Sequence, residues 1–160
     1  QQDGLRSGTL PTPLCVGFGC AAEYLQLPDT LQRIGEMQER RDKFVEYILT
    51  SPFVAMLNGP TTEVRHPGNA NIRFSDIDAR QLLGMLQPKI AASMGSACAS
   101  GIPEPSYVLR SIGLSNEEAY SSIRFSLGLD TTDEDVTDSI DIISDALSRM
   151  VEDEPVRKAI

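Results

Sequence analysis

Several residue types are scarce in this 160-residue sequence, and each scarcity argues against a class of site. The chain has no tryptophan, one histidine and three cysteines, and the cysteines show neither C-x-x-C nor paired-ligand spacing. A disulfide framework is therefore not expected, and neither is a zinc site or any other metal site. We expect the three thiols to be reduced, as thiols are in a cytoplasmic setting.

Positive charge is scarce as well. The chain has 14 Lys and Arg residues against 23 Asp and Glu residues, which gives a formal net charge of -9. Phosphate groups are neutralised by clustered Lys and Arg, and here these residues are scattered, so we expect no nucleic-acid or anionic membrane surface. No apolar run approaches the ~20 residues that span a bilayer. The first residues, Gln-Gln-Asp-Gly, lack the basic start and apolar core of a signal peptide, which favours a soluble, cytoplasmic chain.

One cysteine lies in a sequence context that favours reactivity. Cys98 is surrounded by Ser, Ala and Gly in the run from Ser93 to Gly101, and two prolines follow. A cysteine taken alone is most often a buried, inert residue. Small neighbours bury little, so this loop, residues 93–105, offers access to the thiol. Because the thiolate is the reactive form, the site still needs a nearby base or positive charge to lower the thiol pKa.

Hydrophobic periodicity predicts one α+β domain over residues 29–150, preceded by an arm with a short helix (1–28) and followed by a flexible tail (151–160). The fold expected is a small antiparallel sheet of about three strands, covered by helices over 31–49, 78–86 and 136–150. Strand candidates lie at 54–57, 70–74, 90–93 and 122–127, and a further short helix spans 106–112. Caps are expected at Asp76, at Thr131 or Thr132, and in the Ser115 to Glu118 capping box.

Three motifs occur in order along the chain. They are R-S-G-T at Arg6–Thr9, E-P-S-Y-V-L-R at Glu104–Arg110 after the Cys98 loop, and S-I-R-F-S-L-G at Ser122–Gly128. This series resembles the cysteine desulfurases, fold-type I pyridoxal-phosphate (PLP) enzymes of the class V aminotransferase family. The loop length is similar to the long-loop subgroup, which serves iron–sulfur cluster assembly and related thiolation pathways. The resemblance implies the C-terminal small domain of such an enzyme.

The resemblance also implies a reaction and a set of site residues. The complete enzyme would remove sulfur from L-cysteine as a persulfide on Cys98, release L-alanine, and pass the sulfur to an acceptor protein. Arg124 would anchor the substrate carboxylate, although alternation in the strand alone equally predicts a solvent-facing arginine. Thr9 would contact the PLP phosphate of the neighbouring subunit, which implies a homodimer.

Part of the family pattern is absent from the chain. Family members carry an S-x-H-K motif whose lysine binds PLP, whereas Lys43, Lys89 and Lys158 all lack a preceding histidine. We therefore expect that this chain alone binds no PLP and is inactive, and that residues 1–28 join it to a PLP-binding large domain or partner chain. Two alternatives remain open: a non-catalytic fragment or split subunit that acts as a binding module, and a selenocysteine lyase.

The other polar and thiol side chains are assigned structural roles. Cys15 and Cys20 lie among apolar and small residues, which predicts that they pack in a core. His66 precedes Pro67-Gly68 and is predicted to be a turn residue. Three further residues are expected to fix backbone and loop geometry: Asn71, Glu104 and Arg110.

Overall fold

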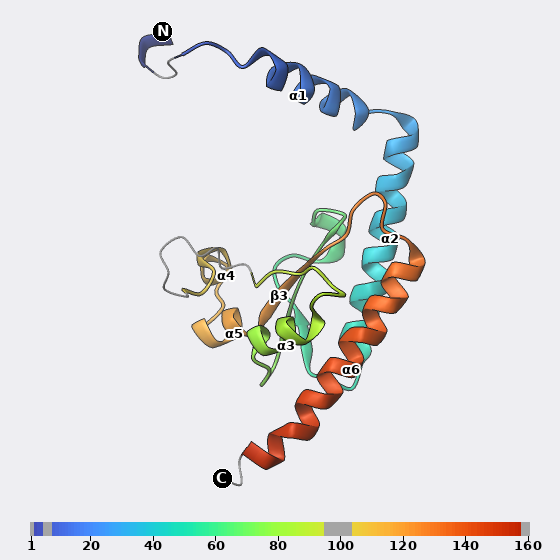
Figure 1. Ribbon diagram of the computed structural model, residues 1–160, viewed down its shortest axis with the longest axis vertical. Helices are drawn as coiled ribbons and strands as arrows, with labels where there is room; N and C mark the ends of the chain where they lie inside the picture. The colour runs from blue at the N-terminus through green and yellow to red at the C-terminus, as the bar shows by residue number, and fades with distance from the viewer. Residues whose placement is uncertain (1, 5–7, 95–103, 158–160) are drawn as a thin grey trace.

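The structure is a computed structural model that describes residues 2–4, 8–94 and 104–157 (Figure 1). The helices are α1 (Thr12–Tyr24), α2 (Pro28–Thr50), α3 (Ala79–Leu86), α4 (Tyr107–Ser111), α5 (Asn116–Tyr120) and α6 (Asp133–Arg157). The strands are β1 (Ala55–Leu57), β2 (Asn69–Phe74) and β3 (Ser122–Ser126), and two short 3-10 turns span Gln2–Gly4 and Thr62–Val64. This confirms the predicted α+β class.

The three strands form one antiparallel sheet in the order β1-β2-β3. In its register, Ala70 lies opposite Phe125 and Asn71 lies opposite Arg124. Helices α2, α3 and α6 pack on one face of the sheet, as predicted (Figure 1). We call the opposite face, which carries the side chains of Asn71 and Arg124, the open face. Burial alternates along β2, so Ala70, Ile72 and Phe74 point to the helices and their neighbours point to the open face.

The core lies between the sheet and these helices. Phe44 of α2 meets Phe125 of β3 with ring centroids 5.1 Å apart and the planes tilted by 60°. Each such side chain contributes about 1.5–3 kcal/mol when it is fully buried. The large apolar side chains that are fully buried in the core are Ile48, Ile72, Phe74, Leu82, Leu86, Ile123, Ile143 and Leu147.

Helix α2 forms over the predicted range because its apolar residues recur at helical spacing, and Pro28 suits the first turn. Its polar side contacts the start of α6. Arg40 Nε and Lys43 Nζ each lie 3.1 Å from a carboxylate oxygen of Asp133. Both hydrogen bonds lower the pKa of Asp133, and the bond from Lys43 has the larger effect. The contacts hold α2 and α6 side by side, as Figure 1 shows.

Of the three predicted caps, two are correct and one is wrong. Ser115 and Glu118 form the expected capping box at the start of α5. Asp78, however, caps α3: its carboxylate accepts from the Arg80 N–H at 2.8 Å. Asp76 has φ 61 and lies in the turn two residues before this N-cap, outside the position whose side chain caps the helix. Thr132 exchanges hydrogen bonds with Asp135 at the start of α6, as predicted.

Three further predictions differ from the structure. The strand candidate 90–93 reduces, within the described residues, to one isolated bridge between Ser93 and Arg124. Helix α6 does not end near Met150 but continues to Arg157, into the segment predicted as a tail.

The third difference concerns the thiols of α1. Cys15 and Cys20 are exposed, not buried, because α1 extends away from the sheet and none of its residues is buried (Figure 1).

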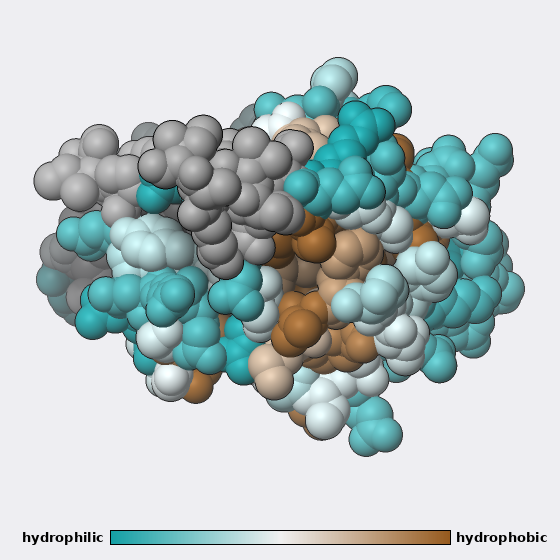
Figure 2. All heavy atoms as spheres, turned by 90° about the horizontal axis from the view of Figure 1, so that it is seen from below, coloured by the Kyte–Doolittle hydropathy of each residue, from teal (hydrophilic) through white to brown (hydrophobic). Residues whose placement is uncertain are grey.

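The face of the molecule drawn in Figure 2 is mostly hydrophilic, in agreement with the charged residues of the sequence. Figure 2 shows hydrophilic side chains over most of the face seen from below, with apolar side chains gathered in one hollow. Among the described residues, none of the helices combines the length and apolar character required to cross a membrane.

Candidate functional site

Arg124 lies in the middle of β3 and points to the open face. Its neighbours Ile123 and Phe125 are buried under the helices, whereas Arg124 is exposed. This confirms the alternation predicted from the sequence. No carboxylate or carbonyl within residues 8–94 and 104–157 pairs with its guanidinium, so the five N–H groups are available to an anionic ligand.

The backbone of Arg124 holds the segment that leads to the cysteine loop. The Ser93 N–H donates to the Arg124 carbonyl at 3.1 Å, and the Arg124 N–H donates to the Ser93 carbonyl at 2.6 Å. Met94, the next residue, packs against the edge of the core. The start of the loop is therefore fixed beside Arg124. Cys98 itself lies outside the described residues.

A polar network lies on β1, β2 and β3 next to Arg124. The Asn58 side chain is 5% exposed, and its Nδ2 donates to Asn71 Oδ1 at 2.7 Å and to Ser122 Oγ at 2.9 Å. The Ser122 hydroxyl in turn donates to the Glu118 carbonyl at 2.6 Å. Asn71 therefore fixes local geometry, as expected, and it does so directly opposite Arg124.

Two arginines hold the connection between β1 and β2. Arg41 is fully buried and donates to the carbonyls of Thr62 at 2.9 Å and His66 at 3.2 Å. Arg65 donates to the carbonyls of Asn58 at 2.5 Å and Pro60 at 2.7 Å. Burial, and then repulsion by Arg41, lowers the pKa of Arg65. Neither residue was predicted from the sequence: Arg41 lies in a charged helix, where an arginine normally faces solvent, and Arg65 lies in a connection without a recognisable motif.

The remaining predicted residues lie farther from this group. His66 is a turn residue, as predicted, because its Nδ1 accepts from the Gly68 N–H at 3.2 Å. Glu104 and Arg110 are exposed, and their side chains make no hydrogen bond within the described part of the chain. Thr9 is exposed in the arm before α1. Because the arm and α1 lie apart from the sheet in Figure 1, one chain does not bring Thr9 to Arg124.

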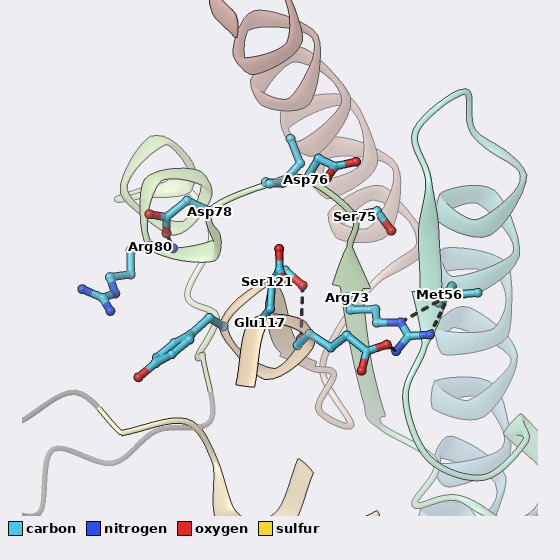
Figure 3. Close-up of a pocket in the computed structure, with 11 residues that line it drawn as sticks. Met56, Arg73, Ser75, Asp76, Asp78, Arg80, Glu117 and Ser121 are labelled. Atoms are coloured by element: carbon cyan, nitrogen blue, oxygen red, sulfur yellow. Dashed lines mark hydrogen bonds and ion pairs between the residues drawn. The ribbon is translucent and has the colours of Figure 1, made fainter. Parts of the chain in front are cut away.

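A separate pocket of about 790 Å³ lies between β2, α3 and α5 (Figure 3). Arg73 contacts both Glu118 and the Met56 sulfur, and Arg80 lies 5.6 Å from the centre of the Tyr120 ring. The backbone N–H of Ser115 and the charge of Arg73 lower the pKa of Glu118. These charges are already paired, and none of the predicted site residues lines the pocket.

Two of the three lysines lie within the described residues. Lys43 is exposed on α2 and pairs with Asp133, and Lys89 is exposed beside α3. Lys89 lines a second pocket, of about 630 Å³, together with residues of β3 and α6. Lys158 lies outside the described residues.

The sequence of this chain is similar to those of known cysteine desulfurases. The chain is 39% identical over 152 residues to the cysteine desulfurase IscS of Rickettsia typhi, covering 94% of this chain and 36% of that protein. The IscS of Rickettsia felis is 37% identical over 158 residues, with 98% and 37% covered. The chain thus spans just over a third of the length of these relatives.

Solved structures agree with this similarity. A NifS-like protein superposes with a TM-score of 0.72 at 27% identity, over 92% of this chain and 37% of that chain. DndA from Streptomyces lividans gives a TM-score of 0.56 at 30% identity, over 79% and 34%. The family model for aminotransferase class-V matches residues 1–138. The chain therefore belongs to the aminotransferase class-V family.

Proposed function

We propose that this chain is the C-terminal part of a cysteine desulfurase, in which Arg124 binds the carboxylate of L-cysteine and Cys98 receives its sulfur. The observation that carries the proposal is the pairing of Ser93 with Arg124. It joins the segment leading to Cys98 to the strand that exposes the Arg124 guanidinium, for which the described part of the chain offers no partner. A planar guanidinium suits a carboxylate because it can donate two parallel hydrogen bonds.

The cofactor belongs to the part of the enzyme outside this chain. The family is PLP-dependent, and bound PLP acts as the electron sink that labilises the substrate carbon–sulfur bond. Because no lysine of this chain lies in an S-x-H-K motif, the complete enzyme holds the cofactor through a PLP-binding large domain or partner chain. Thr9 contributes to the phosphate site of a neighbouring subunit in a homodimer.

The sulfur transfer itself is nucleophilic. The Cys98 thiolate forms a bond to the substrate sulfur while the bond between that sulfur and carbon breaks, and the carbon takes a proton to give L-alanine. The persulfide then passes its outer sulfur to an acceptor protein for iron–sulfur cluster assembly or thiolation. A reduced, cytoplasmic setting keeps such thiols available.

The test is a pair of cysteine substitutions in the full-length enzyme. Cys98→Ser should abolish the release of alanine and sulfide from L-cysteine while PLP absorbance is retained, because a hydroxyl is a far weaker nucleophile than a thiolate. Cys15→Ser is the matched control and should leave the rate nearly unchanged, since Cys15 lies on α1 apart from the sheet. Mass spectrometry should detect one added sulfur atom on Cys98. A persulfide on Cys15 or Cys20 would refute the assignment.

A further inference from the structure

Asn71 and Arg124 form a side-by-side pair on the open face. They lie directly opposite each other in the register of β2 and β3. The Arg124 N–H and carbonyl bond to Ser93, and the Asn71 carbonyl accepts from the Asn58 N–H at 2.8 Å, so the two residues share no backbone hydrogen bond. In an antiparallel sheet, the side chains of a non-hydrogen-bonded pair lie closer together than those of a hydrogen-bonded pair.

The hydrogen atoms of the neighbouring network fix the orientation of the Asn71 amide. The Ser122 hydroxyl donates its single hydrogen to the Glu118 carbonyl, so its oxygen can only accept from Asn58. Asn58 must therefore present its NH₂ group to both Ser122 and Asn71. Asn71 accepts that bond with Oδ1, which leaves its own Nδ2 as a donor on the side away from Asn58.

Two donors thus lie together with no acceptor between them. The Asn71 Nδ2 and the Arg124 guanidinium carry only N–H groups, and no described residue accepts a hydrogen bond from either. Asn71 is half-buried, so its amide cannot turn freely into bulk water, and its bond to Asn58 holds it in place. A pair of adjacent, fixed donors is complementary to an anion with two oxygens.

We propose that Asn71 is a second binding residue for the substrate carboxylate, donating from Nδ2 to one oxygen while Arg124 binds the other. This inference rests on the proposed function for the identity of the substrate, an α-amino acid. It adds a specificity element, because a network running from β1 through β2 to β3 positions the amide before the substrate arrives. A substrate without a carboxylate would leave both donors unpaired.

The first test uses the 160-residue chain and sodium propionate as the carboxylate probe, at constant ionic strength maintained with sodium chloride. Nitrogen-15 NMR should show the Asn71 side-chain amide and the Arg124 Nε–H shifting together with one dissociation constant. The Asn69 side-chain amide is the control: it lies on the same strand but opposite Ser126, and its Oδ1 accepts from Arg65. A shift of Arg124 without Asn71, or no shift of either, overturns the inference.

The second test compares two isosteric variants in the full-length enzyme. Asn71→Asp keeps an oxygen for Asn58 but replaces the donor by a charged acceptor, so the KM for L-cysteine should rise by about tenfold or more. Asn69→Asp adds the same charge two residues away and should change KM by less than about twofold. Arg124→Ala is the positive control, and its KM should rise at least as much as that of Asn71→Asp.

The outcomes separate this inference from the proposed function. If the wild-type enzyme releases no alanine and sulfide from L-cysteine, the proposed function fails, and the propionate titration still decides whether Asn71 binds a carboxylate. If the wild-type enzyme is active but Asn71→Asp keeps its KM within about twofold, the inference fails and the proposed function stands.

Discussion

The buried guanidinium of Arg41 should be one of the largest single polar contributions to stability in this domain. Arg41 lies on α2 with no exposed surface and donates to two carbonyls of the connection between β1 and β2, at 2.9 and 3.2 Å. Its Nε lies 2.6 Å from a carboxylate oxygen of Asp42, but without hydrogen-bond geometry. The perturbation is Arg41→Met, which keeps much of the side-chain length and removes the donors.

The magnitude follows from the two carbonyl contacts. A hydrogen bond from a charged donor contributes about 1.5–3 kcal/mol. Two such bonds give about 3–6 kcal/mol, and methionine offsets part of that loss because the guanidinium itself no longer has to be desolvated. Asp42 Oδ1 is buried beside Arg41 Nε, so the substitution also leaves this carboxylate oxygen without its ion-pair partner. We expect a net loss of about 3 kcal/mol, against a total of about 5–15 kcal/mol for a typical domain.

The assay is urea unfolding of the 160-residue chain, followed by circular dichroism. Arg40→Met is the matched control: Arg40 precedes Arg41 on α2, but it is partly exposed and pairs with Glu36 and Asp133 across the helix surface. It should cost less than about 1 kcal/mol. If the two variants lose equal stability, the carbonyl contacts of Arg41 do not carry the energy assigned to them.

Two further predictions concern packing and pH. Gly68→Ala should lower the Tm measured by calorimetry, because a Cβ there would overlap the Leu127 carbonyl oxygen and lie 3.0 Å from Met37 Sδ. Gly84→Ala is the control and should not lower the Tm, because a Cβ at that position meets no atom within 4 Å. The second prediction concerns acid unfolding. Hydrogen bonds from Lys43 and Arg40 lower the pKa of Asp133 in the folded chain. The contribution of Asp133 to stability is therefore complete above the ordinary Asp pKa, and it is lost as the pH falls through the lower pKa of the folded state. Asp133→Asn should therefore show a shallower loss of stability below about pH 4 than the native chain does, and equal slopes would contradict the contact.

Local patterns predicted most of the fold. Helix α2, the capping box at Ser115 and the alternation around Arg124 depend on residues close in sequence, and the structure confirms all three. Predictions that depended on distant partners were less successful. Whether residues 90–93 form a strand depends on how long they run beside β3, and only Ser93 does so.

The candidate site shows the same division. Arg124 could be singled out from its motif, but the sequence offers no signal that Asn58, Ser122 and Asn71 meet, because they come from three separate strands or strand ends. Arg41 was missed for a related reason. Its charged neighbours on α2 predict a solvated face, and only the connection from Asn58 to Asn69 turns that position into a buried one.

The exposed thiols of α1 affect how the purified chain behaves in solution. Cys15 and Cys20 are five positions apart on one helix, so they point in directions about 140° apart and cannot form a disulfide with each other. Oxidation in air would therefore link thiols of different molecules. Because Leu14 and Phe18 are 73% and 79% exposed on the same helix, apolar contact between chains would favour that encounter. A reductant would convert covalent dimers formed through Cys15 or Cys20 back to single chains.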